Sequence, residues 1–448
     1  MLQNLTDLFS SMSGIVWGIP MVILLFGTHL FLTFRLGFMQ KFIFKGIRDS
    51  VRPDPESPGE VSPFASLTTA LAATVGTGNI FGVAGAILIG GPGALVWMWL
   101  TGLFGIATKY GECLLSVKYR EKHPDGHYVG GPMVVLDKGL GMKPLAIAFA
   151  AFTAIAAFGI GNMVQSNTIA GMVDKVSLES TWFPHVPHWM TGLILTVLTA
   201  VVILGGIKSI SKVCSFLVPF MAVIYVFGCL ILIGMNIQEL PATLKLIFSS
   251  SISGHAAVGG FSGAVIAKTV QMGIARGLFS NEAGMGSAPI VSAAARSSDP
   301  VRQALISATA TFWDTVVICL LTGLVIVGSG EWMNAADKQE LSQLAFGQLP
   351  GLGPFILTFG LMTFVLSTIL GWSYYGERAV EYLFGEKAIF PYRLLWVAAV
   401  MFGAMVQIDL VWNFADVANA LMTIPNLVSL ILLSGVIASE TKRYFKNS

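Results

Sequence analysis

The stretch Thr74-Val75-Gly76-Thr77-Gly78-Asn79 lies inside an otherwise apolar run that extends from about Phe64 to Ile89. Each glycine weakens a helix by roughly 1 kcal/mol relative to alanine, so two glycines within six residues predict a break in a membrane helix. Irregular backbone at membrane depth persists only where it is buried in protein or lines a polar cavity. Its free carbonyl groups suit a cation or an ammonium group, and the N-terminus of the resumed helix suits a carboxylate. The stretch therefore predicts a site for a zwitterionic amino acid and a cation.

The composition around this stretch is that of a polytopic membrane protein. Hydrophobic residues make up 54% of the 448 residues, charged residues make up 11%, and the mean hydropathy is +0.75. A helix needs about 20 residues to cross a hydrocarbon core. The apolar runs of about that length lie near residues 14–36, 62–89, 93–117, 144–173, 188–205, 212–235, 261–297, 300–328, 352–377, 391–407 and 414–439. We therefore expect an all-α polytopic membrane protein with eleven transmembrane helices, forming a single transmembrane transporter domain over residues 1–448.

The distribution of Lys and Arg predicts the orientation. Twenty of the 26 basic residues fall in loops on one side of the membrane, whereas the other side holds only Lys175, Lys245 and Lys338. By the positive-inside rule, the N-terminus lies outside and the C-terminus in the cytoplasm of a prokaryotic-type plasma membrane. The net charge of +2 and the absence of a basic patch give no indication of a nucleic-acid partner. The four cysteines sit in apolar spans without a C-x-x-C pattern, which indicates neither disulfides nor zinc.

After the first span, the others divide into two groups of five, so the second group runs opposite to the first. Inverted repeats of this kind are a common transporter design. The second group also opens with a glycine-rich run, from Arg276 to Gly286. We expect Ser280 to cap a half-helix from about Asn281 to Ala295 whose N-terminus lies near the membrane midplane. The alternative for each break is that its glycines only allow close helix packing.

Two further spans carry polar residues that could face the breaks. In the fourth span, Asn162 and Gln165 are three residues apart and share a helix face, next to Phe158. This face either lines the cavity or makes hydrogen bonds between helices. In the ninth span, the hydroxyls of Ser367 and Thr368 could join free carbonyl oxygens in a cage for a small cation. The alternative is that each hydroxyl bonds to its own preceding turn.

Several ionisable side chains fall within the spans, where each would cost about 2.5–3.5 kcal/mol if it faced lipid. Lys109 and Glu112 are spaced to pair on one helix face. Arg276 and Glu282 bracket the second break and could fix its geometry. Asp314 is the most central acid, and it is either a proton site or the partner of a basic residue such as Lys268.

Three motifs resemble the alanine/glycine:cation symporter family, within the amino acid–polyamine–organocation superfamily. They are TVGTGNIFGVA at residues 74–84, GGPGALVWMW at 90–99 and GLFSNEAGMGSAP at 277–289. The resemblance covers essentially the whole chain and implies sodium-coupled uptake of alanine or glycine. It also implies a leucine-transporter-like inverted five-helix repeat, with residues 62–236 and 255–439 as the two halves and 14–36 as an extra N-terminal helix.

The resemblance carries a set of site residues with it. The sodium site of the leucine-transporter group would fall on the carbonyls of Ala72, Val75 and Phe364 and the hydroxyls of Ser367 and Thr368. We expect one sodium ion per cycle, because a second site of that group needs an Asn near Ala73 and the sequence offers only Asn79. The expected substrate-binding residues are Thr74, Gly76, Thr77, Gly78, Asn79, Phe158, Gln165, Gly277, Phe279, Ser280 and Trp372, of which Phe279 and Trp372 would form walls of the pocket.

The sequence thus predicts a symporter for a small neutral amino acid, alanine or glycine, with sodium as the coupling ion and no other cofactor. Proton coupling through Asp314 or Glu282 is the nearest rival. A channel would use the same breaks as a pore constriction, but no ring-forming repeat favours it. An enzyme would need a nucleophile with its base, or a metal centre, and no span pairs His with a carboxylate at ligand spacing. The sequence therefore indicates that the chain is not an enzyme.

Overall fold

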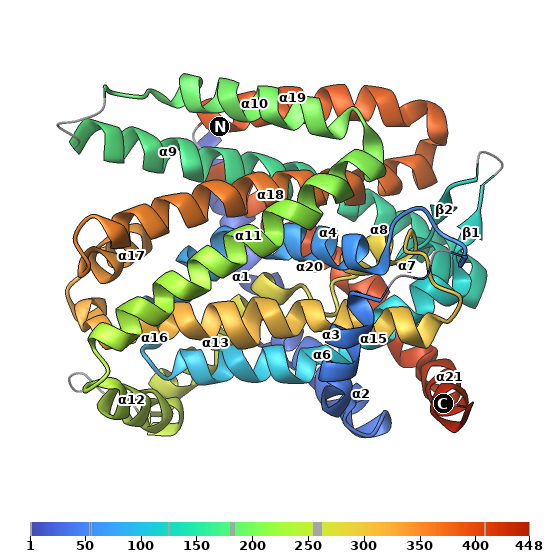
Figure 1. Cartoon of the computed structure of the whole chain (residues 1–448), viewed down its shortest axis with the longest axis horizontal. Coiled ribbons are helices and arrows are strands. Elements are labelled where there is room, and N and C mark those ends of the chain that lie inside the picture. Colours follow the sequence, from blue (N-terminus) through green and yellow to red (C-terminus); the bar gives the residue numbers. More distant parts are fainter. Residues whose placement is uncertain are drawn as a thin grey trace.

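Long apolar helices account for most of the chain, and they run across the molecule in roughly parallel or opposite directions (Figure 1). The structure is a computed structural model that describes residues 2–52, 54, 56–123, 126–179, 184–253, 262–406 and 409–447. The only sheet in these ranges is a two-stranded antiparallel hairpin. An all-helical membrane fold, as the sequence predicts, therefore matches the observed architecture.

The first half of the chain contains α1 (Leu2–Val16), α2 (Ile19–Arg35), η1 (Met39–Phe42), α3 (Ile43–Ser50), α4 (Pro63–Thr74), η2 (Thr77–Asn79), α5 (Phe81–Gly90), α6 (Ala94–Tyr119), β1 (Glu121–Lys122), β2 (Tyr128–Val129), α7 (Pro132–Val134), η3 (Val135–Gly139), α8 (Lys143–Ala156), η4 (Ala157–Met163), α9 (Val164–Glu179), α10 (His188–Ile203) and α11 (Gly206–Met235). Here η1 and η2 are 3-10 turns, and η3 and η4 are π-helical segments.

The second half contains α12 (Leu240–Ser253), α13 (Ser262–Asn281), α14 (Ala288–Ser292), α15 (Pro300–Thr311), η5 (Phe312–Cys319), α16 (Leu320–Ser329), η6 (Glu331–Met333), α17 (Lys338–Gly347), α18 (Leu352–Phe384), η7 (Glu386–Ala388), α19 (Ile389–Met405), α20 (Asp409–Leu432) and α21 (Ser434–Asn447). The π-helical segment η5 joins α15 to α16 in one continuous helix.

At least seven helices of the described residues are long and apolar enough to cross a membrane, and the bent pair of α4 and α5 makes an eighth. The other predicted spans also fall on helices: 93–117 on α6, 188–205 on α10, and 261–297 on α13 and α14. Residues 261 and 407 of the predicted spans, and 255–261 of the predicted second repeat, lie outside the described residues. The total of eleven spans and the inverted repeat stay predictions.

Two element boundaries differ from the sequence prediction. The last predicted span, 414–439, ends as α20 at Leu432, and α21 follows as a separate helix. The predicted half-helix from Asn281 to Ala295 is also wrong, because α13 continues through Asn281 and helix resumes only at Ala288. Ser280 is therefore inside a helix and is not an N-cap.

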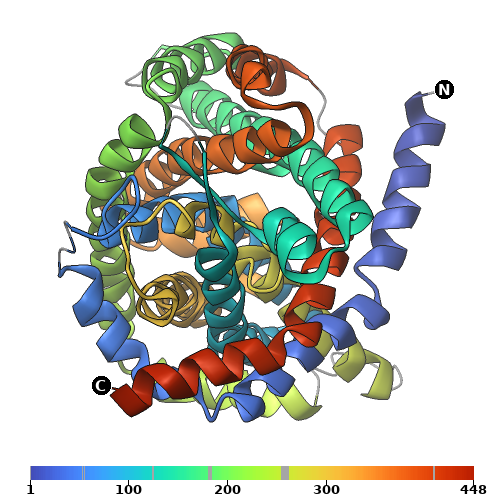
Figure 2. The same cartoon turned by 90° about the vertical axis from the view of Figure 1, so that its right-hand side faces the viewer.

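The packing brings both breaks to the middle of the molecule. Helix α6 packs against α13 and α15, and α18 packs against α4 and α11. The N-terminal helix α1 lies at the edge of the molecule, where it contacts α20 (Figure 2). All four cysteines are buried and free.

Candidate functional site

The first break lies where the sequence predicts it. Helix α4 ends at Thr74, Val75 and Gly76 are extended, and the chain then turns by 63° into the second half of the broken helix. The Gly76 amide donates a hydrogen bond to Oδ1 of Asn79 at 2.8 Å. The Asn79 side chain thus accepts the amide hydrogen that a helical carbonyl would otherwise accept, because a buried backbone N–H needs a hydrogen-bond partner. The predicted membrane-helix break at Gly76 and Gly78 is confirmed.

Oxygen atoms from α18 meet this break. The hydroxyl Oγ1 of Thr368 is 3.2 Å from the carbonyl oxygen of Val75 and 2.9 Å from that of Phe364. The hydroxyl Oγ of Ser367 is 2.9 Å from the same Phe364 oxygen. Ala72 is fully buried in the last turn of α4. The structure thus gathers hydroxyl and carbonyl oxygens, which are the hard ligands that a small cation such as sodium prefers.

A buried carboxylate connects the two broken helices. Asp314, in the π-helical segment η5, accepts a hydrogen bond from the Asn79 amide at 2.7 Å and from the Ser280 hydroxyl at 2.9 Å. The Thr315 hydroxyl also donates to it, at 2.7 Å. The suggested partner Lys268 is wrong, because that residue is exposed. Asn79 and Ser280 direct their side chains to Asp314, and π-helical segments recur at functional sites.

The second break is a loop, Glu282–Ser287, whose backbone needs left-handed conformations. Glu282 has φ 53°, and Gly284 and Gly286 have φ 85° and 86°. Glycine adopts such angles without strain, whereas Glu282 does so at a cost. Trp372 donates its indole N–H to Oε1 of Glu282 at 3.0 Å, and the Ser287 hydroxyl donates to Oε2. These bonds hold the strained residue in place.

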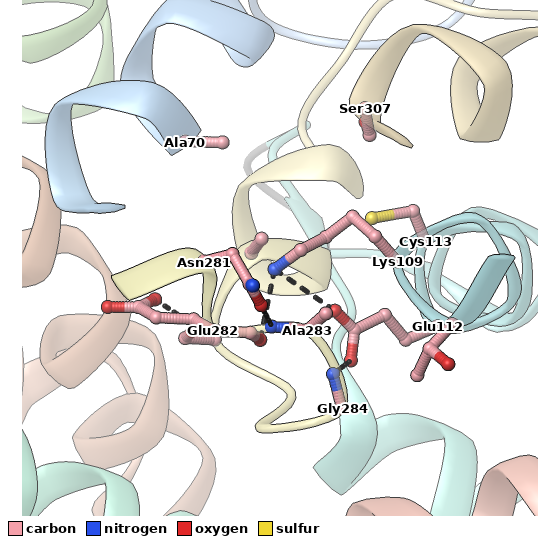
Figure 3. A network of polar contacts seen from close by, with 12 residues as sticks. Ala70, Lys109, Glu112, Cys113, Asn281, Glu282, Ala283, Gly284 and Ser307 are labelled. Atoms are coloured by element: carbon pink, nitrogen blue, oxygen red, sulfur yellow. Dashed lines mark hydrogen bonds and ion pairs between the residues drawn. The ribbon is translucent and has the colours of Figure 1, made fainter. Parts of the chain in front are cut away.

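A buried ion pair fixes the same loop from α6. The Lys109 ammonium lies 3.2 Å from Oε1 of Glu112 and donates to the carbonyl oxygen of Glu282 at 3.0 Å (Figure 3). The second oxygen of Glu112 accepts the Gly284 amide at 3.2 Å. The predicted pairing of Lys109 with Glu112 is confirmed. Glu282 fixes the geometry of this break as predicted, whereas Arg276 lines the cavity beside the first break and is not among the polar partners of Glu282 in the described residues.

The remaining predicted site residues separate into two groups. Gln165 reaches the first break, where its Oε1 finds no hydrogen-bond partner among the described residues and lies 3.6 Å from the position of a Cβ on Gly76. Thr74, at the end of α4, bonds back to its own helix. Phe158 instead packs against Tyr392 and Trp396, with ring centroids 5.2 and 5.4 Å apart, so its assignment to the site is not supported.

Gly277 also has a different role from the one predicted. It lies inside α13, where a Cβ would come 2.1 Å from Oγ1 of Thr101 and 3.0 Å from the carbonyl oxygen of Met98. The glycine allows α13 to approach α6 closely. The packing alternative therefore holds at Gly277, and the break occurs one to two turns later.

A cavity of about 450 Å³ adjoins the first break. Thr77, Gly78 and Phe279 line it as predicted, whereas Trp372 does not and is buried. Its other lining residues are Phe81, Gly82, Gly85, Ile89, Asn167, Thr168, Gly171, Arg276, Lys338, Gln339, Trp412 and Asn413. Apolar and aromatic walls with a few polar groups are typical of a small-molecule pocket.

Two cations give this cavity a positive character, and the sequence analysis did not find them as site residues. Lys338 of α17 stacks its ammonium on the Trp412 ring at 4.7 Å from the centroid. Burial, and secondarily the charge of Arg276, lowers the pKa of Lys338. Arg276 and Lys338 are distant in sequence from the first break. Only the packing of α13, α17 and α20 shows that they line the cavity beside it.

Comparison with known proteins shows the family of this chain. The sodium:alanine symporter family matches the chain over residues 2–448. The chain belongs to that family. The sodium/alanine symporter AgcS of Methanococcus maripaludis is 48% identical over 99% of the chain and 98% of its own length. The probable sodium/glutamine symporter GlnT of Bacillus subtilis is 35% identical over 99% of the chain and 91% of its own length.

A solved transporter structure has a fold similar to that of this chain. The crystal structure of MhsT in complex with L-phenylalanine matches with a TM-score of 0.60 at 14% identity, covering 86% of this chain and 93% of that one. Members of the sodium:alanine symporter family are transporters, so this chain is an integral membrane transporter and not an enzyme. The resemblance identified from the three sequence motifs is thereby confirmed.

Proposed function

We propose that the chain imports a small neutral amino acid, alanine in the first place and glycine in the second, together with sodium by alternating access. The observation that carries the proposal is the contact between Oγ1 of Thr368 and the carbonyl oxygen of Val75. It joins α18 to the broken helix with two oxygens that suit sodium. The name of the 48% identical relative AgcS, a sodium/alanine symporter, supports alanine as the substrate.

The proposed sodium ion binds between α4 and α18, with the carbonyls of Ala72, Val75 and Phe364 and the hydroxyls of Ser367 and Thr368 as ligands. The two helices are otherwise closely packed, since a Cβ on Gly371 would meet the Ala73 amide nitrogen at 2.7 Å. An ion here would favour the conformation in which α4 and α18 are joined, because it binds only when both sets of oxygens are present.

The proposed substrate lies beside the same break. Thr77 and Gly78 line the cavity, and Oε1 of Gln165, which has no hydrogen-bond partner among the described residues, faces Gly76. Arg276 and Lys338 favour an anion in the cavity, which suits the carboxylate end of an amino acid as it approaches. In the proposed orientation, with the N-terminus outside, α17 and Lys338 are on the external side.

Uptake into proteoliposomes tests this proposal. The purified chain is reconstituted, and accumulation of labelled alanine is measured under an imposed inward sodium gradient or an imposed proton gradient without sodium. We expect accumulation with sodium and competition by glycine. Accumulation driven by the proton gradient alone would overturn sodium coupling in favour of proton coupling.

Thr368→Ala should weaken sodium activation of alanine uptake by about tenfold or more, which corresponds to about 1.4 kcal/mol. The variant removes the hydroxyl that lies between the carbonyl oxygens of Val75 and Phe364. Thr363→Ala is the matched control, because the Thr363 hydroxyl donates to the preceding turn of α18, at Phe359 and Gly360. Sodium titrations of initial uptake measure the effect, and an unchanged sodium dependence in Thr368→Ala would place the ion elsewhere.

Trp372→Ala should lower the melting temperature, because the buried indole fills the space beside Gly161, where a Cβ would come 2.3 Å from Cβ of Trp372, and donates to Glu282. Trp372→Phe separates the packing from the hydrogen bond, since it keeps a ring but loses the donor. Because Trp372 does not line the cavity, we expect leucine to compete with alanine no better in Trp372→Ala than in the wild type. Effective competition by leucine in Trp372→Ala alone would show instead that this side chain forms a wall of the substrate pocket.

A further inference from the structure

A second cluster of chemistry-bearing side chains lies far along the chain from the breaks, and we propose that it binds a divalent transition metal, with zinc as the probe. The cluster consists of His123, His127, Glu381 and Glu386. One potential ligand atom from each residue lies within 4.8 Å of all the others. Among the described residues, no other group of three or more His, Cys, Asp or Glu side chains is gathered in this way.

The hairpin between α6 and α7 presents the two histidines as a pair. Lys122 of β1 lies opposite Tyr128 of β2, and the His123 amide donates to the His127 carbonyl oxygen at 2.9 Å. The two residues therefore oppose each other next to the hairpin turn, and their rings lie 4.6 Å apart between centroids. Cross-strand neighbours on one face can ligate the same ion.

The two carboxylates come from the end of α18 and the turn η7 that follows it. Nε2 of His127 is 2.7 Å from Oε1 of Glu381, and Nδ1 of His123 is 3.9 Å from the same oxygen. Nδ1 of His123 is also 3.4 Å from Oε1 of Glu386. Neighbouring ligands of a tetrahedral zinc ion are roughly 3.3 Å apart, given bonds of about 2.0–2.1 Å. The three nitrogen–oxygen separations in the cluster, 2.7, 3.4 and 3.9 Å, lie on both sides of this value.

A supporting residue orients the most buried ligand. Glu381 is only 1% exposed, and its second oxygen, Oε2, is 2.6 Å from an Arg378 nitrogen. Outer partners of this kind fix the direction of a metal ligand. Oε1 of Glu381 is thereby left to face the two imidazoles.

The donor set decides the class of metal. Two imidazole nitrogens and two carboxylate oxygens suit zinc and similar first-row ions, whereas calcium and magnesium prefer oxygen ligands alone. A metal bound here would tie the hairpin to the same helix, α18, that carries Ser367 and Thr368. The proposal does not rest on the proposed function.

The competing explanation is a set of hydrogen bonds between histidine and carboxylate without affinity for metal. Isothermal titration of zinc chloride into the purified full-length protein, with any affinity tag removed, separates the two. We expect one zinc ion per chain and a zinc-dependent rise in melting temperature. His123→Ala and His127→Ala should each lower the zinc affinity at least tenfold, and His123→Ala should keep the wild-type melting temperature without zinc.

His185→Ala is the matched control, because His185 is 2.7 Å from the single carboxylate of Asp174 and belongs to another histidine–acid group. We expect it to retain wild-type zinc affinity. The His123 side chain is 33% exposed, so its replacement should disturb folding less than that of His127. His123→Ala therefore tests the proposal even where His127→Ala is unstable. Zinc binding of equal affinity in wild type and His123→Ala, or no binding by the wild type at micromolar zinc, would overturn the proposal.

Discussion

Gly76→Ala should lower the apparent sodium affinity of alanine uptake by about tenfold or more while the protein still folds. A Cβ at this position would come 2.7 Å from Oγ1 of Thr368, closer than a Cβ and a non-bonded oxygen lie in real proteins. The added methyl group would displace the hydroxyl from the carbonyl oxygens of Val75 and Phe364. Gly76 has φ −144° and ψ −153°, a negative-φ extended conformation, so the expected loss comes from the steric contact.

Gly234→Ala, in α11, is the control for this variant, since nothing lies within 4 Å of a Cβ at Gly234 and the residue is exposed. We expect it to transport as the wild type does. Sodium titrations of uptake in proteoliposomes, with melting temperatures of the purified variants, make the comparison. A Gly76→Ala variant with wild-type sodium dependence would show that the Thr368 hydroxyl does not have to lie against the first break.

Asp314→Ala should lower thermal stability and abolish transport. The substitution removes the acceptor of three buried donors, from Asn79, Ser280 and Thr315. Each unsatisfied buried donor costs about 1–3 kcal/mol. Asp314→Asn keeps the size but presents an amide N–H₂ to donors, so it should fold better than Asp314→Ala and still lose most uptake.

The matched control is Asp174→Asn, a partly exposed acid that contacts His185 instead of the breaks. Melting temperatures and initial rates of alanine uptake give the two readouts. Wild-type uptake by Asp314→Asn would contradict the view that this carboxylate connects the two broken helices.

The first break was predictable because local chemistry decides it. Two glycines and an asparagine in an apolar run cannot continue a membrane helix at low cost. The Ser367 and Thr368 pair was a hypothesis from two adjacent hydroxyls in one span, and the family resemblance supported it, although hydroxyls in spans usually bond to their own helix. The structure shows such bonds for both residues, and in addition the contact of Thr368 with Val75.

The second break was predicted in the right run but at the wrong residues. Glycines at 277, 284 and 286 all weaken a helix, and the sequence does not distinguish a glycine that is needed for packing from one that is needed for a left-handed turn. Gly277 packs against Met98 and Thr101 of α6, whereas Gly284 and Gly286 have positive φ. Only the long-range contact with α6 separates the two roles.

The contacts of Asn79 and Phe158 were not predictable for the same reason. Asn79 and Asp314 are 235 positions apart, and their hydrogen bond depends on how η2 and η5 pack. Phe158 is a large aromatic residue of the kind that can form a pocket wall. In the structure it packs instead against Tyr392 and Trp396 of α19, which is distant in sequence. Periodicity identifies the face of a helix, and tertiary packing decides what that face contacts.

The most direct test of the central claim, that the first break binds the substrate, is alanine binding by Gly78→Leu. A Cβ on Gly78 would lie 3.5 Å from the Phe279 ring, an ordinary contact, so Gly78→Ala should fold and bind alanine. A leucine would extend further into the cavity that Gly78 and Phe279 line. Alanine-induced thermal shift in sodium reports the binding, because a ligand stabilises the folded state according to its affinity. We predict that Gly78→Leu melts as the wild type does without ligand and shows no shift with alanine. A Gly78→Leu variant with the wild-type shift would contradict the account.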